Sequence, residues 1–469
     1  MTEFIDVRNP RSGVNDYRIP VHDADASAAV VAGLRQAQPA WRALGAAGRA
    51  EVLLAWGLAL DGARDALLAA VCADTGRYRE SAQEVDAVLS TLRRWCAQGP
   101  ALLAGTPDRP SAIPSISIRA GHTPFAVAGV ISPWNFPLLL SLIDAIPALL
   151  AGCAVVIKPS EITPRFVAPL RAAIAQVPQL EAVLQLITGA GHTGATLIGQ
   201  VDVVCFTGSV ATGRKVGEAA ARAFVPAFLE LGGKDPAIVL DDADIKRAAR
   251  AIAWGGMGSA GQSCMSIERV YVDRRIAPAF LDALVHEVSR LRHCYPDIRD
   301  GEIGPIISEA QAAIAARHLA EALEQGATAL CGGQVLDLGG GKWCQPTVLG
   351  GVRHGMSVVD EESFAAILPV MTFGSDDEAV ALANDTRFGL SAAVFGGDQQ
   401  RALAVAARLE AGAISINDAA LTAVVHEGAK QSFKLSGMGG SRMGSASIAR
   451  FYRQQSYLIS NGADDAWWF

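Results

Sequence analysis

Residues 125–131 read Phe-Ala-Val-Ala-Gly-Val-Ile, and a Pro-Trp-Asn-Phe-Pro segment follows at 133–137. Further short apolar runs occur at 154–157, 203–206 and 236–240, with amphipathic segments between them. Short apolar strands that alternate with helices are typical of a parallel, doubly wound sheet. We therefore expect an α/β fold in which residues 125–240 form such a sheet.

A second alternating series follows the first, and we expect it to form a second α/β domain joined to the first near 235–245. Ala- and Leu-rich periodicity over 26–98 predicts a helical lead-in, and alternating Ile residues over 106–119 predict an exposed or edge strand pair. The strands expected in the second series are 269–272, 367–371 and 413–416, and its helices are 276–292, 308–325 and 399–410.

The length and composition favour a globular protein of several domains that does not bind nucleic acid. The chain has 469 residues, 51% of them hydrophobic, and a net charge of −7. Because this length exceeds one core of usual size, we expect more than one domain. Lys and Arg are scattered without a basic run, which argues against a nucleic-acid partner.

Cysteine usage and the apolar segments indicate a cytoplasmic protein. The eight cysteines form no CxxC pair and no spacing with His typical of zinc, so we expect reduced thiols and no metal site. The N-terminus lacks the basic and apolar segments of a secretory signal. The most apolar stretch, 125–157, contains three prolines with Asn135 and Asp144, which disfavours a membrane helix.

Polar side chains follow the predicted strands at their carboxyl ends, where open α/β sheets bind ligands. Asn135 could donate to an oxyanion, or it could be a turn residue beside two prolines. Lys158 and Glu161 could bind ribose hydroxyls, although solvated surface charges would have the same sequence. The turn 207–213, Thr-Gly-Ser-Val-Ala-Thr-Gly, could bind a phosphate at a helix start or be an ordinary turn, because it is neither GxGxxG nor a P-loop.

The most informative pair is Cys264, within Gly-Gln-Ser-Cys-Met-Ser at 261–266, and Glu230, within Glu-Leu-Gly-Gly-Lys at 230–234. Small neighbours leave room for a substrate beside the thiol, and the carboxylate could act as a general base. Neither residue is diagnostic alone, because most cysteines are small buried apolar residues and a turn glutamate can point into water.

Together these motifs resemble the NAD(P)-dependent aldehyde dehydrogenase superfamily, of the non-acylating type, over nearly the whole chain. Their order and spacing agree with that family. Three further segments match: 361–364 (Glu-Glu-Ser-Phe), 384–390 (Asn-Asp-Thr-Arg-Phe-Gly-Leu) and 412–418 (Gly-Ala-Ile-Ser-Ile-Asn-Asp).

The resemblance implies oxidation of an aldehyde to a carboxylic acid. Cys264 would attack as a thiolate to give a thiohemiacetal and then a thioester, and Glu230 would activate the hydrolytic water. The Asn135 side chain and the Cys264 backbone N–H would hold the oxyanion. By the same resemblance, Lys158 is also expected to be a catalytic residue. Since a cysteine with a pKa of ~8.5 is only a few per cent ionised at pH 7, the site must favour the thiolate.

The resemblance also implies a dinucleotide site. Lys158 and Glu161 would hold the adenosine ribose, and Ser209 the pyrophosphate. The Glu161 carboxylate would accept hydrogen bonds from a 2′-hydroxyl and repel a 2′-phosphate, which favours NAD, with NADP possible. Glu362 and Phe364 would surround the nicotinamide ribose. The expected cofactor contacts are Trp134, Lys158, Ser160, Glu161, Gly208, Ser209, Gly213, Leu231, Gly232, Glu362 and Phe364.

Two segments depart from the family pattern. The usual Phe-Gly-Pro is Phe-Ala-Ala at 364–366, so we expect a different turn behind the nicotinamide site. The usual Pro-Phe-Gly-Gly-x-Lys is replaced by Lys-Gln-Ser-Phe-Lys at 430–434, and the loop 419–432 is longer. In the family this loop shapes the substrate entrance.

The candidates for the substrate pocket are mostly apolar. None is Arg or Lys, which favours an apolar or aromatic aldehyde over a semialdehyde with a carboxylate, although His426 could bond a polar group. Ordinary core packing is the alternative for each residue. The candidates are Phe136, Leu140, Ile143, Trp254, Met265, Val424, Val425 and His426.

We expect a dinucleotide-binding domain at 1–106 and 126–236, and a catalytic domain at 237–445. By the resemblance, 107–125 and 446–469 form the oligomerisation strands of a homodimer or homotetramer, with a C-terminal tail. The terminal Trp-Trp-Phe at 467–469 would pack at an interface, reach a substrate entrance or be disordered. The alternative functions are a CoA-acylating dehydrogenase, expected to lack a carboxylate at position 230, and a catalytically silent scaffold.

Overall fold

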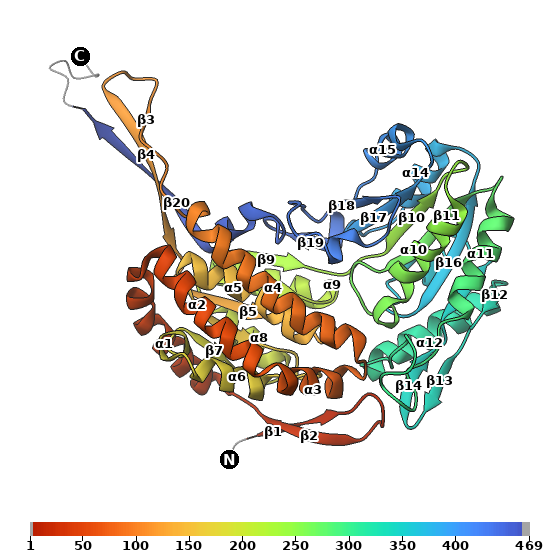
Figure 1. Cartoon of the computed structure of the whole chain (residues 1–469), viewed down its shortest axis with the longest axis horizontal. Coiled ribbons are helices and arrows are strands. Elements are labelled where there is room, and N and C mark those ends of the chain that lie inside the picture. Colours follow the sequence, from red (N-terminus) through yellow and green to blue (C-terminus); the bar gives the residue numbers. More distant parts are fainter. Residues whose placement is uncertain (1–2, 462–469) are drawn as a thin grey trace.

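The computed structural model describes residues 3–461, and two largely parallel sheets dominate it (Figure 1). Each sheet has its own buried core. Residues from 31 to 231, with 448 and 451, form the first core, and residues from 237 to 419 form the second. The predicted aromatic tail at 467–469 lies outside the described residues.

The first sheet has the strand order β19-β9-β8-β5-β6-β7, and every pair except β19–β9 is parallel. All residues of β5, β6 and β8 are buried, which explains their continuous apolar sequences. The strands are β5 (Val127–Ile131), β6 (Ala154–Lys158), β7 (Leu184–Leu186), β8 (Val203–Thr207), β9 (Ala227–Glu230) and β19 (Gly437–Met438).

Helices cover the first sheet, as the sequence predicts. Helix α1 packs against β5, β6 and β7, whereas α5 packs against β5 and β6 and is itself covered by α2 and α4. A hairpin, β1 (Phe4–Arg8) with β2 (Asn15–Pro20), precedes them. The helices are α1 (Ala24–Ala43), α2 (Gly45–Gly62), α3 (Arg64–Thr75), α4 (Arg79–Leu102), α5 (Pro137–Ala151), α6 (Val167–Ala175), α7 (Pro178–Glu181), α8 (Gly191–Ile198) and α9 (Val210–Ala223).

The second sheet has the order β12-β15-β16-β11-β10-β17-β18, with only β12 antiparallel to its neighbour. Its strands are β10 (Asp235–Val239), β11 (Ile267–Asp273), β12 (Thr328–Cys331), β15 (Thr347–Gly350), β16 (Ile367–Phe373), β17 (Ser391–Phe395) and β18 (Ala413–Ile416). Its helices are α10 (Ile245–Met257), α11 (Ala277–Ser289), α12 (Glu309–Glu324), α13 (Ser357–Asp360), α14 (Asp376–Asn384) and α15 (Gln399–Ala406), and the hairpin is β13 (Val335–Leu338) with β14 (Gly341–Cys344).

Some strand assignments from the sequence are wrong. The run 236–240 forms β10, but β10 pairs with β11 and β17 in the second sheet instead of extending the first. The first sheet instead uses β9, which has only four residues and ends in a charged one, so its sequence resembles a turn. Residues 437–438, expected in the catalytic segment, pair with β9 because the chain returns to the first sheet there.

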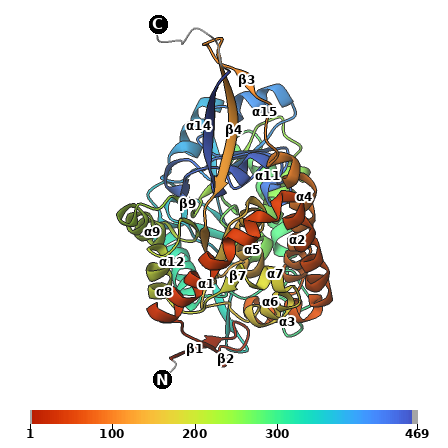
Figure 2. The same cartoon turned by 90° about the vertical axis from the view of Figure 1, so that its left-hand side faces the viewer.

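A third sheet extends away from the two main ones (Figures 1 and 2). In it, β20 (Tyr452–Ser460) pairs antiparallel with β4 (Ile116–Pro124), which also pairs with β3 (Arg109–Pro110). Segments near the two ends of the sequence therefore form one ribbon. It exposes Tyr457 and Leu458, the latter by 71%.

No single helix within residues 3–461 combines the length and apolar composition needed to cross a membrane. Helices α1 and α2 meet that test only as a pair, and the pair is bent by 114°.

Candidate active site

Three of the predicted side chains lie at one edge of the first sheet. Glu230 is the last residue of β9 and Lys158 the last residue of β6, while Asn135 follows β5 directly before α5. Strands β6, β5, β8 and β9 are parallel neighbours. Their carboxyl ends, and the side chains that follow them, therefore share one edge.

A strained turn holds the segment that carries Cys264. It lies between α10 and β11, where Ser259, Ala260 and Gly261 have φ values of 57°, 55° and 72°. Such left-handed backbone is unfavourable for residues with a Cβ. A Cβ at Gly261 would also overlap the backbone of Ala365, so this position requires glycine. The turn thereby anchors the cysteine segment against the 364–366 turn.

Asn135 contacts the cysteine segment directly. Its Nδ2 donates to the carbonyl oxygen of Gln262 at 3.0 Å, and the residue is only 4% exposed. Gln262 is itself fixed, because its Nε2 donates to Pro305 O at 3.0 Å and its Oε1 accepts from Ile307 N at 2.9 Å. An amide nitrogen has two N–H groups, so Asn135 keeps one for a second acceptor.

Glu230 also belongs to this site. Its turn packs against the cysteine, because a Cβ at Gly233 would overlap the carbonyl of Cys264. The carboxylate accepts a hydrogen bond from Ser432 Oγ at 3.4 Å, and Lys430 Nζ lies 3.8 Å from its Oε2. Both partners come from the segment that departs from the family pattern.

Lys430 lies beside Glu230, and no sequence pattern pointed to it. The prediction of a pocket without Arg or Lys considered only eight residues, and the ammonium of Lys430 lies beside one of the predicted catalytic groups. Position 430 lies in a segment that deviates from the expected motif. Because sequence alone does not give side-chain direction, the segment predicts an entrance loop and not a contact with Glu230.

The thiol of Cys264 is disfavoured as an anion in this structure. Burial raises the pKa of Cys264 to about 12. Lys430 acts in the opposite direction and lowers this pKa, whereas Glu230 and Glu362 raise it. The thiolate population of the site therefore depends on the balance of these neighbouring charges.

The residues expected at the adenosine ribose lie together at the end of β6. Lys158 Nζ is 2.9 Å from Glu161 Oε2, with the lysine side chain 5% exposed and the carboxylate 34% exposed. Ser160 lies between them, and its Oγ accepts from the N–H of Ile162 at 3.2 Å. This turn therefore holds a donor and a partly exposed acceptor side by side.

The expected phosphate turn begins α9. Ser209 is the N-cap residue, and its Oγ accepts from Thr212 N at 3.3 Å. Gly208 and Gly213 have close neighbours, since a Cβ there would overlap the ring of Phe206 and the side chain of Leu231 respectively. Leu231 is buried and donates its N–H to Ser436 O at 2.8 Å. The N-terminal backbone of α9 thus lies at the same sheet edge as Glu230.

The residues expected around the nicotinamide form a second group. Trp134 and Phe364 meet edge to face, with ring centroids 5.3 Å apart. Glu362 Oε1 accepts from Gly233 N at 3.0 Å, and a Cβ at Gly232 would overlap that carboxylate. Burial raises the pKa of Glu362 to about 8, and Glu268 adds to this effect. The group therefore joins the 230–234 turn to the 361–364 segment.

Glu268 organises the turn that contains Phe364, and no sequence motif points to this residue. Its two carboxylate oxygens accept from Ser363 N at 2.7 Å and Phe364 N at 2.8 Å, and Lys234 Nζ lies 2.6 Å away. Phe364 has a φ of 48°, which a side chain rarely adopts. The altered Phe-Ala-Ala turn is therefore held by a buried ion pair.

Comparison with known proteins agrees with this geometry. The model of the "Aldehyde dehydrogenase family" matches residues 1–457. The chain belongs to the aldehyde dehydrogenase family. It is similar to the structure named "Putative Aldehyde Dehydrogenase PutA" from Anabaena variabilis, with 52% identity, a TM-score of 0.98 and all of both chains covered.

Two further similar proteins have more specific names. The chain is 38% identical over 369 residues to 4,4'-diapolycopene aldehyde oxidase of Methylomonas sp, covering 78% of this chain and 68% of that protein. Betaine aldehyde dehydrogenase from Staphylococcus aureus, solved in complex with NAD+, has 29% identity and a TM-score of 0.92, with 99% of this chain and 93% of that chain covered. Aldehyde oxidation is thus the reaction class supported by the family.

The predicted pocket residues of this aldehyde dehydrogenase lie on separate elements. Phe136 is the N-cap residue of α5, and it is partly exposed, as are Leu140 and Ile143 on one side of that helix. Met265 contacts the 419–432 loop, because Thr422 Oγ1 lies 3.0 Å from its Sδ. Trp254, on α10, is 54% exposed. The contacts join Met265 to the loop but do not place the α5 residues against it.

The other loop candidates face different surroundings. Val424 and Val425 are 63% and 49% exposed. The carbonyl of His426 accepts from Arg94 Nη1 on α4 at 3.5 Å, and burial lowers the pKa of the His426 imidazole. His426 therefore links the loop to α4, while the two valines remain available to a ligand.

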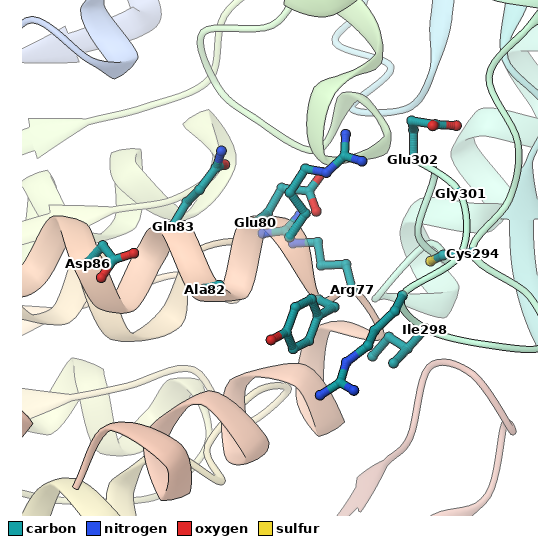
Figure 3. A pocket seen from close by; sticks show the side chains of 12 residues that line it. Arg77, Glu80, Ala82, Gln83, Asp86, Cys294, Ile298, Gly301 and Glu302 are labelled. Carbon is teal, nitrogen blue, oxygen red and sulfur yellow. The ribbon is translucent and has the colours of Figure 1, made fainter. Parts of the chain in front are cut away.

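A cavity of about 310 Å³ opens between the start of α4 and the segment 294–302 (Figure 3). Arg77 lines it and also reaches the active site, where its guanidinium donates to the carbonyls of Asn135 and Ser259. Glu80 accepts from Ser259 N at 3.2 Å. These two residues fix the backbone next to the predicted oxyanion donor and before the cysteine, and neither was selected from the sequence.

Proposed function

We propose that the chain oxidises an aldehyde to a carboxylic acid with NAD, through a thiohemiacetal and a thioester on Cys264. The observation that supports this most is the convergence of Asn135 and Glu230 on the cysteine segment. Asn135 Nδ2 bonds to Gln262 O at 3.0 Å, and Gly233 in the Glu230 turn lies against the Cys264 carbonyl. A nucleophile, an amide donor and a carboxylate are the groups that this chemistry requires.

Each residue has a distinct task in the proposed reaction. The Cys264 thiolate attacks the aldehyde carbon, and the remaining N–H of the Asn135 amide stabilises the resulting oxyanion. Loss of one such donor typically costs roughly a hundredfold in rate. The nicotinamide, when bound, supplies the acceptor for the hydride. Glu230 then takes a proton from the water that cleaves the thioester, releasing the acid and the Cys264 thiol.

The residues at the end of β6 and the start of α9 fit a dinucleotide. Glu161 presents a partly exposed carboxylate, held by Lys158 at 2.9 Å, which suits a ribose 2′-hydroxyl better than a 2′-phosphate. The backbone N–H groups at the start of α9, next to Ser209, suit a pyrophosphate. We therefore propose NAD as the preferred cofactor, with NADP as a weaker one.

We propose an apolar or aromatic aldehyde as substrate. The sequence argument was that no pocket candidate is Arg or Lys, whereas the argument here is that the nearby lysine is paired. Lys430 is present in the site, but its charge is matched by Glu230 and needs no carboxylate on the substrate. The candidate side chains at and within α5, beside Cys264 and on the loop are apolar, namely Phe136, Leu140, Ile143, Met265, Val424 and Val425.

We further propose the domain limits and assembly expected from the sequence. The separation of the two cores near 231–237 favours a cofactor domain at 1–106 and 126–236 and a catalytic domain at 237–445, apart from β19. The exposed apolar Leu458 on the β20–β4 ribbon favours use of 107–125 and 446–469 in a homodimer or homotetramer.

A Cys264→Ala variant tests the function. Formation of NADH is measured for wild type and variant across aliphatic, aromatic and carboxylated aldehydes, with and without CoA, and again with NADP. We expect acid and NADH from the wild type without CoA, and no detectable rate from the variant. Cys331→Ala is the matched control, because Cys331 is a partly exposed thiol on β12, the edge strand of the second sheet.

Two outcomes would overturn the proposal. Product that forms only with CoA would identify an acylating dehydrogenase. A Cys264→Ala variant that reduced NAD with aldehyde at the wild-type rate would exclude the covalent mechanism.

A further inference from the structure

Lys430 is buried beside the carboxylate that the proposed reaction uses as its base. Its side chain is 7% exposed, and its Nζ lies 3.8 Å from Glu230 Oε2. Lysine side chains are almost never this buried unless they are paired. The loop therefore brings an ammonium group into the site, and Glu230 is its partner.

Both contacts between the loop and Glu230 fall on the same carboxylate oxygen. Ser432 Oγ donates to Oε2 at 3.4 Å, and Lys430 Nζ approaches that same atom. No hydrogen bond within residues 3–461 reaches Glu230 Oε1. A carboxylate accepts through either oxygen, so holding one of them determines the direction of the other. The Oε1 atom is thus the one left for a water molecule.

Strand pairing aligns the loop with Glu230. The chain leaves the loop to form β19, in which Gly437 is the register partner of Glu230. Ser432 packs closely on Gly437, because a Cβ added there would lie 2.8 Å from the serine Cβ. The N–H of Lys430 donates to Ser441 Oγ at 3.0 Å. These contacts fix the loop backbone from which both side chains reach the carboxylate.

A second cation lies near Glu230 but has other partners. Arg442 donates to Thr207, the register partner of Glu230 on β8, and its Nη2 lies 2.8 Å from Asp144 Oδ2. In the described part of the chain, neither a hydrogen bond nor an ion pair joins Arg442 to Glu230. Within residues 3–461, Lys430 is therefore the cation that contacts the proposed base.

We infer that Lys430 and Ser432 are positioning residues that hold Glu230 Oε2 against the loop, so that Oε1 is offered to the water that hydrolyses the thioester. This inference rests on the proposed function, since only that reaction requires a base at Glu230. In this step Oε1 takes a proton from the water, the water oxygen bonds to the thioester carbon, and the C–S bond breaks. The proton then passes to the Cys264 sulfur, which restores the thiol. The loop 419–432 thereby acts on the hydrolysis as well as on substrate entry.

The kinetic test separates hydrolysis of the thioester from its formation. Wild type, Lys430→Met, Lys430→Arg and Ser432→Ala are mixed with NAD and an aldehyde that the wild type oxidises. Stopped-flow absorbance gives the rate of NADH formation in the first turnover, and quenched-flow mass spectrometry follows the decay of the acyl-enzyme on Cys264. Lys246→Met is the control, because Lys246 is an exposed lysine on α10.

Two further measurements do not depend on turnover. Circular dichroism verifies that each variant is folded. Crystal structures of the wild type and of Lys430→Met give the direction of the Glu230 carboxylate in each protein.

We expect Lys430→Met to slow hydrolysis about tenfold while the first turnover keeps its rate, because a misplaced base loses part of its usual contribution. Ser432→Ala should lose less, since it keeps the ammonium, and Lys430→Arg should recover most of the lost rate. In the crystal structure of Lys430→Met, Glu230 Oε2 should leave its wild-type position. Lys246→Met should match the wild type in both rates.

Unchanged hydrolysis in Lys430→Met, or an unchanged Glu230 carboxylate in its crystal structure, would overturn the inference. An equal loss in both rates would also overturn it, because Lys430 would then support the fold or bind the substrate. A wild type that oxidises no aldehyde would overturn the proposed function instead. In that case the two crystal structures would still decide whether Lys430 positions Glu230.

Discussion

Lys234–Glu268 and Lys430–Glu230 are two lysine–glutamate pairs beside the Cys264 segment, and their construction differs. The first pair is 2.6 Å apart with side chains 0% and 2% exposed, and it joins the start of β10 to β11. The second pair is 3.8 Å apart with side chains 7% and 15% exposed, and it joins β9 to a loop. The first is thus a close, dry contact, and the second is a looser contact at the substrate side.

The difference shows how similar residues acquire different tasks. The two carboxylate oxygens of Glu268 accept hydrogen bonds from Ser363 N and Phe364 N. The carboxylate is therefore fully occupied by the backbone of the nicotinamide turn. The Glu230 carboxylate accepts a 3.4 Å hydrogen bond from Ser432 Oγ, and the Lys430 ammonium lies 3.8 Å away. Because both contacts are long, Glu230 can exchange these partners for a water molecule. A pair whose carboxylate has all its hydrogen bonds made (a saturated pair) supports the fold. A pair whose carboxylate has few hydrogen bonds (an unsaturated pair) can bind a water molecule or a substrate.

The largest effect is expected from breaking the saturated pair. Lys234→Met leaves the Glu268 carboxylate buried without its cation, which typically costs about 3–5 kcal/mol. We expect a clearly lower apparent melting temperature and weaker NAD binding, because the Phe364 turn loses its support. Differential scanning fluorimetry and cofactor titration measure both.

The exposed lysine variant Lys246→Met is the control for this experiment, and it should melt like the wild type. If the Lys234→Met protein were as stable as the wild type, the Lys234–Glu268 pair would not have the structural role assigned to it. It would mean that the buried pair contributes nothing beyond what apolar packing provides.

The second effect concerns the unsaturated pair. Glu230→Gln removes the proposed base while keeping the side-chain shape, and general base catalysis typically contributes about a hundredfold or more. We expect steady-state turnover to fall by that factor while a first burst of NADH persists and acyl-enzyme accumulates on Cys264. Stopped-flow absorbance and intact-protein mass spectrometry detect these two signals.

Glu218→Gln, on the exposed face of α9, provides the matched control. Loss of the burst in Glu230→Gln would contradict the assignment, because Glu230 would then be needed before the thioester forms. Loss of folding would make Glu230 a structural residue like Glu268.

The comparison also shows what sequence could predict. Asn135 and Lys158 follow predicted strands and lie at one sheet edge, because strand ends in a parallel sheet converge. Glu230 lies at the same edge, but through a strand that was not predicted. The assignment of Cys264 to the same site came from motif order, and its contact with the Glu230 turn follows from two adjacent glycines that let the backbones approach. These features follow from local sequence patterns.

Features that depend on distant side chains could not be predicted in this way. Glu268 is a single charged residue in an apolar strand, and only the fold shows that it binds the turn at 363–364. Lys430 belongs to a loop whose length departs from the family, so neither periodicity nor motif gives its direction. Strand β9 was missed because a four-residue strand ending in Glu230 resembles a turn.

The smallest effect is expected from removing the cation of the looser pair. Lys430→Met should change the free energy of unfolding by less than about 1 kcal/mol, because a long contact with a partly exposed partner contributes little. Thermal melts of Lys430→Met and Lys234→Met, measured side by side, test this. Equal destabilisation of the two variants would show that the two pairs contribute equally to the stability of the fold.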